Sequence, residues 1–443
     1  MFEPIALEVL LTPRKKVLVN SSNQLLDVLL QIRAHDYPDR QLVRSPLAIS
    51  IVIDRSGSMT GGKLEEAKHA AIDIVSRLHS TDLVCVVVYD SNVETLMELM
   101  PAQVAKALIE QKLNQIQTQG TTNLHGGWLR GAEILAPKSN GKEVCRVILL
   151  SDGQANRGIT DLDQICAQVA DLAVAGISTT TVGFGLGFNE ELMTAMAYAG
   201  QGNAWYGERV QDLMESFDSE MSYLESLVFK EIEVEVHYNG RYLRMRNDYY
   251  STSKNAWRLS GIAISSEKWM AFSLKMSEVI EIQSLGKILE IEIHLTDSKG
   301  GHHTVHANLL PMQVVDPATY DVFEENELVS RRFQEVEMAD IQREARGLLR
   351  EGDWQGVEDM INELESRARN NLWILETVKY LRKLLVRRDS RRMQKELLYS
   401  SNSMKNRNAA INDGVEYSMN AEAIKPAFLR KKTAQGRNFD SQV

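Results

Sequence analysis

Cysteine is scarce in this chain, which has three among its 443 residues, at Cys85, Cys145 and Cys166. An odd number of cysteines cannot pair completely, and each of the three lies inside a run that we predict to be a strand or a helix. We therefore interpret them as buried thiols and not as a disulfide framework.

Long apolar runs are also absent, since no run approaches the roughly 20 apolar residues that cross a bilayer. The apolar patch from Ile5 to Leu11 is interrupted by Glu8, and the charged residues of Pro13-Arg14-Lys15-Lys16 follow it. In a secretory signal the charges come before the apolar part. Together with the few cysteines, this order predicts a cytoplasmic protein of bacterial type with no membrane partner.

A surplus of basic residues is missing as well. The net charge of -10 argues against general nucleic-acid binding, which normally requires a basic balance. The hydrophobic content of 44% and the charged content of 25% are ordinary for a globular protein. A chain of this length can form two or three domains, each with its own core.

Common catalytic motifs are not found. The chain has neither His-Glu-x-x-His nor Gly-x-Ser-x-Gly. In residues 181–188 a dinucleotide fingerprint would need its third glycine at the position of Phe188, and Gly141-Lys142 lacks the earlier glycine of a P-loop. We expect ordinary loops at both places, and we expect a protein that is not an enzyme.

The most informative segment is residues 51–59, with the sequence Ile-Val-Ile-Asp-Arg-Ser-Gly-Ser-Met. An apolar, β-branched run that stops at an acid predicts a buried strand that ends in a tight loop, where Gly57 lets the backbone bend. The loop presents the carboxylate of Asp54 and the hydroxyls of Ser56 and Ser58. Oxygen ligands without cysteine or histidine suit a small hard cation such as Mg²⁺ better than zinc.

Two later segments supply similar groups. Residues 120–124, Gly-Thr-Thr-Asn-Leu, place a hydroxyl before a helical pattern, and residues 147–153, Val-Ile-Leu-Leu-Ser-Asp-Gly, form a second buried run that ends at an acid. The order Asp-x-Ser-x-Ser, Gly-x-Thr and Ser-Asp-Gly resembles the von Willebrand factor A family with its metal-ion-dependent adhesion site. The resemblance implies five metal-site residues: Asp54, Ser56, Ser58, Thr122 and Asp152.

The same resemblance implies how these residues would act. The three hydroxyls would bind Mg²⁺, or Mn²⁺ or Ca²⁺, directly or nearly so, and the two aspartates would bind it partly through water. The Gly-x-Thr spacing favours Thr122 over its neighbour Thr121. The alternative, that Ser56 and Ser58 only cap a helix near Lys63, explains neither Thr122 nor Asp152.

Residues 46–227 alternate between strand and helix patterns, which predicts a mainly parallel sheet covered on both faces. The expected strands are 47–54, 83–89, 144–151, 177–184 and 204–206. The expected helices are 64–78, 102–116, 124–135, 162–175, 190–199 and 211–227. All five site residues then follow the carboxyl ends of strands, where open α/β sheets bind ligands.

The flanking segments show a period of two, typical of antiparallel strands. We expect such strands at 5–11, 16–19, 25–33, 231–238, 242–245, 256–259, 269–274, 281–282, 288–295 and 304–310. The predicted fold class is α/β, a Rossmann-like doubly wound parallel sheet inserted in a β-sandwich and followed by a C-terminal helical region. The predicted domains are N-terminal sandwich strands (1–45), the von Willebrand factor A domain (46–228), the rest of the sandwich (229–315), a helical hairpin or bundle (316–400) and a disordered tail (401–443).

Three smaller features have alternative interpretations. His302, His303 and His306 surround a turn, where a solvated hairpin is favoured over a metal site. The helices after Phe323 either cap the sandwich or bind a partner. The basic run from Lys379 to Lys395 is either a solvated face or a surface for an acidic partner or nucleic acid.

The functional hypothesis is a metal-dependent protein-protein interaction module whose Mg²⁺ is completed by a carboxylate from a protein partner. One alternative is an accessory subunit of a multi-subunit AAA+ ATPase system, similar to MoxR-type or metal-chelatase assemblies. A second alternative is a structural protein with an unused metal site.

Overall fold

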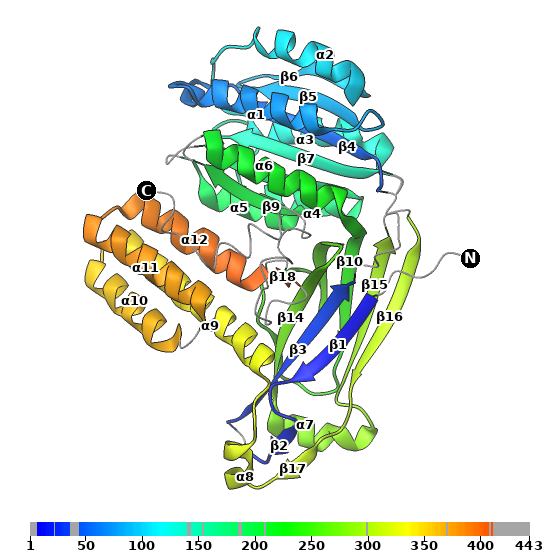
Figure 1. Cartoon of the computed structure of the whole chain (residues 1–443), viewed down its shortest axis with the longest axis vertical. Coiled ribbons are helices and arrows are strands. Elements are labelled where there is room, and N and C mark those ends of the chain that lie inside the picture. Colours follow the sequence, from blue (N-terminus) through cyan, green and yellow to red (C-terminus); the bar gives the residue numbers. More distant parts are fainter. Residues whose placement is uncertain are drawn as a thin grey trace, which may run out of the picture. The chain divides into compact units, whose positions relative to one another are not determined.

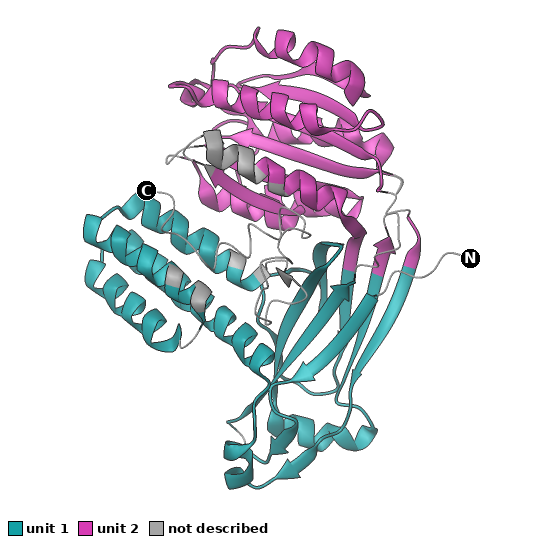
Figure 2. Ribbon diagram, in the orientation of Figure 1, with its two compact units in different colours: residues 1–38, 233–294, 303–443 teal, residues 39–232, 295–302 magenta. Residues whose placement is uncertain are grey.

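The computed structural model describes residues 7–21, 23–35, 44–139, 143–152, 155–184, 188–207, 210–297, 300–368, 371–406 and 409–410. The chain forms two compact units, coloured in Figure 2. Unit 1 comprises residues 1–38, 233–294 and 303–443, and unit 2 comprises residues 39–232 and 295–302. None of the described helices is both long and apolar enough to cross a membrane.

Unit 2 contains a six-stranded sheet in the order β6-β5-β4-β7-β8-β9. Neighbouring strands are parallel except for the antiparallel edge pair β5 and β6. The strands are β4 (Leu47–Asp54), β5 (Leu83–Tyr89), β6 (Val93–Pro101), β7 (Val144–Ser151), β8 (Ile177–Phe184) and β9 (Gln201–Gly207). Every residue of β4 and β7 is buried, which explains their unbroken apolar runs.

Helices cover both faces of this sheet, so the predicted doubly wound α/β fold is confirmed (Figure 1). They are α1 (Lys63–Arg77), α2 (Ala102–Leu113), α3 (Leu124–Leu135), α4 (Leu162–Val174), α5 (Glu190–Ala199) and α6 (Val210–Glu225). Short 3-10 turns lie at Gly57–Met59 and Ala136–Lys138. Asn123, Asp161 and Asn189 cap α3, α4 and α5, because their side-chain oxygens accept hydrogen bonds from the first turn.

Most strands of unit 1 belong to two sheets, and a few strands of these sheets extend past the boundary into unit 2. The first has the order β1-β3-β14-β11, with β18 also paired to β14, and the second has the order β12-β13-β10-β15-β16. The first sheet consists of β1 (Leu7–Pro13), β3 (Leu25–Ala34), β11 (Leu243–Met245), β14 (Ser266–Lys275) and β18 (Ala409–Ala410). The second consists of β10 (Leu227–His237), β12 (Tyr250–Ser253), β13 (Ala256–Ala263), β15 (Leu289–Asp297) and β16 (His302–Leu309).

The first sheet joins strands from both sides of the inserted segment. β3 pairs with β14 over ten residues, from Leu25↔Lys275 to Ala34↔Ser266. Residues far apart in the chain therefore share one sheet, as the expected insertion requires. The face-to-face packing of a β-sandwich remains a prediction.

One expected sandwich strand is present but lies outside the two large sheets, and another is a helix. Val17–Val19 forms β2, but it pairs in parallel with β17 (Gln313–Val315) outside the two large sheets. Glu281 and Ile282 belong to helix α7 (Met276–Ile282), which continues into a 3-10 turn at Gln283–Leu285. In the structure Met276 and Val279 are buried at a helical spacing of three. The strand was expected because the short run at residues 279–282, Val-Ile-Glu-Ile, also fits the alternation of a strand.

The helical region begins with α8 (Pro317–Val322) and continues with α9 (Glu327–Glu351), α10 (Trp354–Ala368), α11 (Leu372–Arg387) and α12 (Ser390–Asn406). The first half of α9 packs on β3 and β14, where Val329, Phe333 and Val336 meet Leu29 and Trp269. The second half of α9 shares an apolar core with α10, α11 and α12. This arrangement fits a helical cap on the first sheet.

A buried ionic cluster also joins α9 to that sheet. Arg332 contacts Glu267 of β14 at 3.4 Å and Glu335 of its own helix at 3.1 Å. Glu267 in addition accepts hydrogen bonds from Gln31 and Arg33 of β3. Each carboxylate of this cluster therefore has a buried cationic or amide partner.

The basic run from Lys379 to Lys395 is divided between two helices, α11 and α12. Arg388 has a left-handed φ of 51° and ends α11, and Asp389 caps α12 by accepting from the Arg392 N–H. Part of the basic run is used within unit 1. Arg382 bonds to Asn362 and Glu365, and the Arg388 guanidinium lies 5.3 Å from the Trp354 ring centre.

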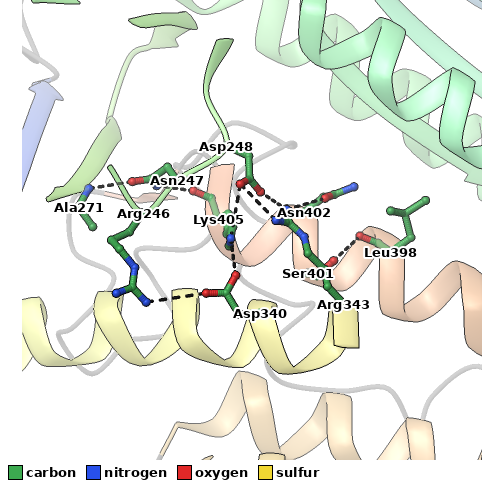
Figure 3. Close-up of polar contacts among 10 residues, drawn as sticks. All are labelled: Arg246, Asn247, Asp248, Ala271, Asp340, Arg343, Leu398, Ser401, Asn402 and Lys405. Carbon is green, nitrogen blue, oxygen red and sulfur yellow. Dashed lines mark hydrogen bonds and ion pairs between the residues drawn. The ribbon is translucent and has the colours of Figure 1, made fainter. Parts of the chain in front are cut away.

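Disorder from residue 401 onward is wrong for the first part of the expected tail. α12 continues to Asn406, and Ala409–Ala410 pairs with β14 as β18. Figure 3 shows how the end of α12 is held: Lys405 bonds to Asp248 and Asp340, and its carbonyl accepts from Asn247. Residues 411–443 lie outside the described residues.

Two further expectations concern single loops. His302 and His306 lie at alternating, exposed positions of β16, as a hairpin predicts, and His302 contacts Thr296. The described residues include no group of three or more His, Cys, Asp or Glu side chains placed to hold a metal. Residues 141–142 and 185–187, in the two dismissed glycine motifs, lie outside the described part of the chain.

Candidate functional site

The pairing of β4 with β7 brings the first and last of the candidate residues to one sheet edge. The two strands are parallel and in register, with Ile53 opposite Leu150. Asp54 ends β4, and Asp152 follows Ser151, the last residue of β7. Both acids therefore lie at the carboxyl edge of the sheet, where the loops of unit 2 meet.

Asp54 organises the loop that follows it. Its carboxylate is fully buried and accepts hydrogen bonds from the Ser56 N–H at 2.8 Å and from Ser151 Oγ at 2.7 Å. Burial raises the pKa of Asp54, and the charge of Asp152 adds to this, although the bonds from Ser151 and Ser56 act in the opposite direction. With one bond to each oxygen, Asp54 fixes the loop's path.

A chain of short contacts connects the two serines to Asp152. Ser56 Oγ lies 3.0 Å from Ser58 Oγ, and Ser58 Oγ donates to Asp152 Oδ1 at 2.6 Å. Ser56 and Asp152 are buried, whereas Ser58 is exposed. Four of the five candidate residues therefore form one hydrogen-bonded group that is open to solvent at Ser58.

The loop that carries Thr122 lies against this group, because the Gly57 N–H donates to the Gly120 carbonyl at 3.2 Å. Gly120 has a φ of +67°, and a Cβ there would lie 2.7 Å from Ser91 Oγ, so the position requires glycine. Thr122 is buried, and its N–H donates to Asn156 Oδ1 at 2.8 Å.

Thr121, which precedes Thr122, has different contacts. The Thr121 hydroxyl lies 2.9 Å from Ser91 Oγ, and the Thr121 N–H donates to the same atom. The Thr121 hydroxyl is therefore in contact with Ser91 at an exposed position, and the choice of Thr122 over Thr121 remains a prediction.

Three residues near the site were not assigned from the sequence. Lys63 contacts Asp152 and the Ser58 carbonyl, and Asn156 holds Thr122. Arg55, between Asp54 and Ser56, donates to Asp90 Oδ2 at 2.8 Å. An acid-paired lysine or arginine has no distinctive local pattern, so only the fold could show these contacts.

The donor set can be tested against a divalent metal ion. It offers two carboxylates and three hydroxyls, and no nitrogen or sulfur atom among the five residues, which is the chemistry of a hard cation. Among the described residues, no three His, Cys, Asp or Glu side chains are placed to hold a metal. This is compatible with a hard-cation site here, because only two of the five candidate residues, the aspartates, are of those types. The residues present therefore fit an ion of the Mg²⁺ class.

Comparison with known proteins identifies the inserted segment. Residues 48–219 match the model of the von Willebrand factor type A domain. The chain contains a von Willebrand factor A domain. Domains of this family are generally non-catalytic modules that mediate protein-protein interaction.

Individual relatives cover different parts of the chain. An uncharacterised protein of Synechocystis sp. is 23% identical over 368 residues, which are 79% of this chain and 84% of that protein. Inter-alpha-trypsin inhibitor heavy chain H1 of Sus scrofa is 30% identical over 196 residues, which span 42% of this chain and 21% of that protein. The second likeness therefore concerns about a fifth of the heavy chain's length.

A solved structure is similar over nearly the whole chain. A von Willebrand factor type A protein from Catenulispora acidiphila superposes with a TM-score of 0.70 at 15% identity, and covers 91% of this chain and 97% of its own. At this identity the likeness shows the fold alone. It includes the regions on both sides of the von Willebrand factor A domain.

Proposed function

We propose that this chain is a metal-dependent protein-binding module, in which Mg²⁺ at Asp54, Ser56, Ser58, Thr122 and Asp152 accepts a carboxylate from a protein partner. The observation that carries the proposal is the hydrogen-bonded group Asp54–Ser56–Ser58–Asp152 at the carboxyl edge of the sheet. Its exposed member, Ser58, leaves the group accessible to a partner.

The residue types favour an acidic ligand. A divalent ion held largely by neutral hydroxyls keeps most of its positive charge, and when bound it would supply that charge to an incoming carboxylate. The protein's own residues hold the loops in place. Asp54 fixes the Ser56 backbone, Asn156 fixes Thr122, and the Gly57–Gly120 contact joins the two loops.

Capture of partners from an extract of the source organism tests the proposal. Immobilised wild-type chain is compared with Thr122→Ala, and with Thr121→Ala as a matched control that removes the adjacent hydroxyl. We expect one set of proteins to bind wild type and Thr121→Ala in Mg²⁺. The same proteins should be absent with Thr122→Ala and in EDTA.

The same experiment separates the alternatives. If wild type in EDTA and Thr122→Ala retain every captured protein, the metal site is unused and the proposal is wrong. A captured AAA+ ATPase whose rate changes on mixing would instead identify the chain as an accessory subunit of an ATPase system.

A further inference from the structure

The side chain of Lys63 places a positive charge among the candidate metal ligands. Its Nζ lies 2.6 Å from Asp152 Oδ2 and 3.0 Å from the Ser58 carbonyl oxygen. The other oxygen of Asp152 accepts from Ser58 Oγ. The ammonium thus contacts two of the five site residues, and it neutralises a carboxylate whose side chain is only 4% exposed.

The position of Lys63 in its helix is unfavourable for a cation. Lys63 is the first residue of α1, and the partial positive charge of a helix N-terminus favours acids, as Glu65 and Glu66 of the same turn illustrate. A residue that breaks a local rule often does so for a contact elsewhere in the fold. The contact here is Asp152, which lies 89 residues later in the chain.

A metal ion at the proposed site and this ammonium would both use the Asp152 carboxylate. A divalent cation that used Asp152 and the Ser58 hydroxyl would meet the lysine charge at short range, where the two positive charges repel each other. The lysine side chain is 34% exposed and has a flexible four-carbon stem, so it can move into solvent.

We infer that Lys63 is a built-in counter-cation, which holds Asp152 when no metal is bound and must leave Asp152 for Mg²⁺ to bind. This inference rests on the proposed metal site and adds the residue that regulates its occupancy. Any free energy by which Lys63 stabilises the metal-free protein is subtracted from the affinity for Mg²⁺. Lys63 therefore weakens metal binding and holds Asp152 while the site is empty.

Two measurements on Lys63→Met test this role, because methionine keeps the length of the stem and removes the charge. Calorimetric titration gives the affinity for Mg²⁺, and thermal unfolding in EDTA gives the stability of the metal-free protein. Lys63→Met should bind Mg²⁺ about tenfold more tightly than wild type. It should unfold at a lower temperature in EDTA, because Asp152 loses its counter-ion.

Two control variants make the result specific. Lys63→Arg keeps the charge and should bind Mg²⁺ no more tightly than wild type. Lys112→Met removes the same charge from an exposed position of α2 and should match wild type in both measurements. If Lys112→Met also binds more tightly, net charge and not the Asp152 contact is the cause, and the inference is wrong.

The remaining outcomes distinguish this inference from the proposed function. If wild type and Lys63→Met bind Mg²⁺ equally, or Lys63→Met binds more weakly, the counter-cation role is wrong while the metal site stands. If neither protein binds Mg²⁺, the metal site itself is wrong and the inference fails with it.

Discussion

Asp90 shows how a single residue outside the candidate metal ligands supports the loop that carries them. Asp90 is 1% exposed, and its carboxylate accepts hydrogen bonds from Arg55 Nε, Gln119 Nε2 and the Asn92 N–H. Arg55 lies between Asp54 and Ser56, and the Arg55 N–H donates to the Tyr89 carbonyl. The first site loop is therefore tied to the end of β5 through Arg55.

We predict that Asp90→Asn lowers the free energy of unfolding by about 1–3 kcal/mol at neutral pH. Burial alone would raise the pKa of Asp90, but the bonds from Asn92, Gln119 and Arg55 outweigh it and hold the pKa below its usual value of 3.8. A lowered folded pKa means that this stabilisation is present above about pH 4 and is lost as the pH falls through the folded pKa.

Urea unfolding of wild type and Asp90→Asn, at neutral pH and at about pH 3, measures this effect. The difference between the two proteins should shrink at the acid pH. Glu94→Gln is the control, because Glu94 also pairs with Arg55 but its side chain is 53% exposed, and it should change stability by less than about 0.5 kcal/mol. A difference for Asp90→Asn that does not vary with pH would contradict the account.

At the scale of single residues, the sequence could predict the candidate metal ligands but not the neighbouring residues that hold them in place. Asp54 and Asp152 each follow a buried parallel run, so their approach at one edge could be deduced. Asn156 and Lys63 could not be assigned, because their contacts depend on the paths of loops far apart in the sequence.

At the scale of a single element, helix α3, which follows the Thr122 loop, approaches the sheet closely. A Cβ at Gly127 would lie 2.4 Å from Tyr89 Cδ1, and Tyr89 is fully buried. At Gly131 a Cβ would meet Ser50 Oγ and Val52 Cγ2 of β4, each at 2.6 Å. These glycines let α3 lie against β4 and β5.

We predict opposite effects from alanine at two helical glycines. Gly127→Ala should destabilise the protein by about 1–3 kcal/mol, because the added methyl overlaps the Tyr89 ring. Gly347→Ala, on an exposed face of α9 with no atom within 4 Å of the new Cβ, should stabilise it by about 0.5–1 kcal/mol. Urea unfolding of both variants tests this. A neutral or stabilising Gly127→Ala would show that α3 does not pack against Tyr89 as described.

The accuracy of the predicted elements follows their burial. The bounds of β4, β5, β7 and β8 could be predicted to the residue, because buried parallel strands have continuous apolar runs with abrupt ends. β6 was missed, since an edge strand exposes residues such as Glu94 and loses the apolar pattern. The break between α11 and α12 could not be predicted, because Arg388 has a left-handed backbone conformation without glycine.

For the whole molecule, the sequence indicates an inserted α/β domain but not how the flanking strands pair. The change from a period near 3.6 to a period of two locates the transition close to residue 228. Which N-terminal strand lies beside which later strand cannot be deduced from pattern alone. The pairing of β3 with β14 is a result of the fold, and it lets the Gln31 side chain donate to Glu267, 236 residues later.

The central claim for the molecule is a metal site at the carboxyl edge of the parallel sheet. Isothermal titration of Mg²⁺ into EDTA-treated wild type, Ser56→Ala and Ser76→Ala tests it most directly. Ser56→Ala removes one proposed ligand hydroxyl without changing charge, and Ser76→Ala removes an exposed hydroxyl from α1. We predict one-site binding to wild type and Ser76→Ala and its loss in Ser56→Ala. No binding to wild type, or unchanged binding to Ser56→Ala, would contradict the account.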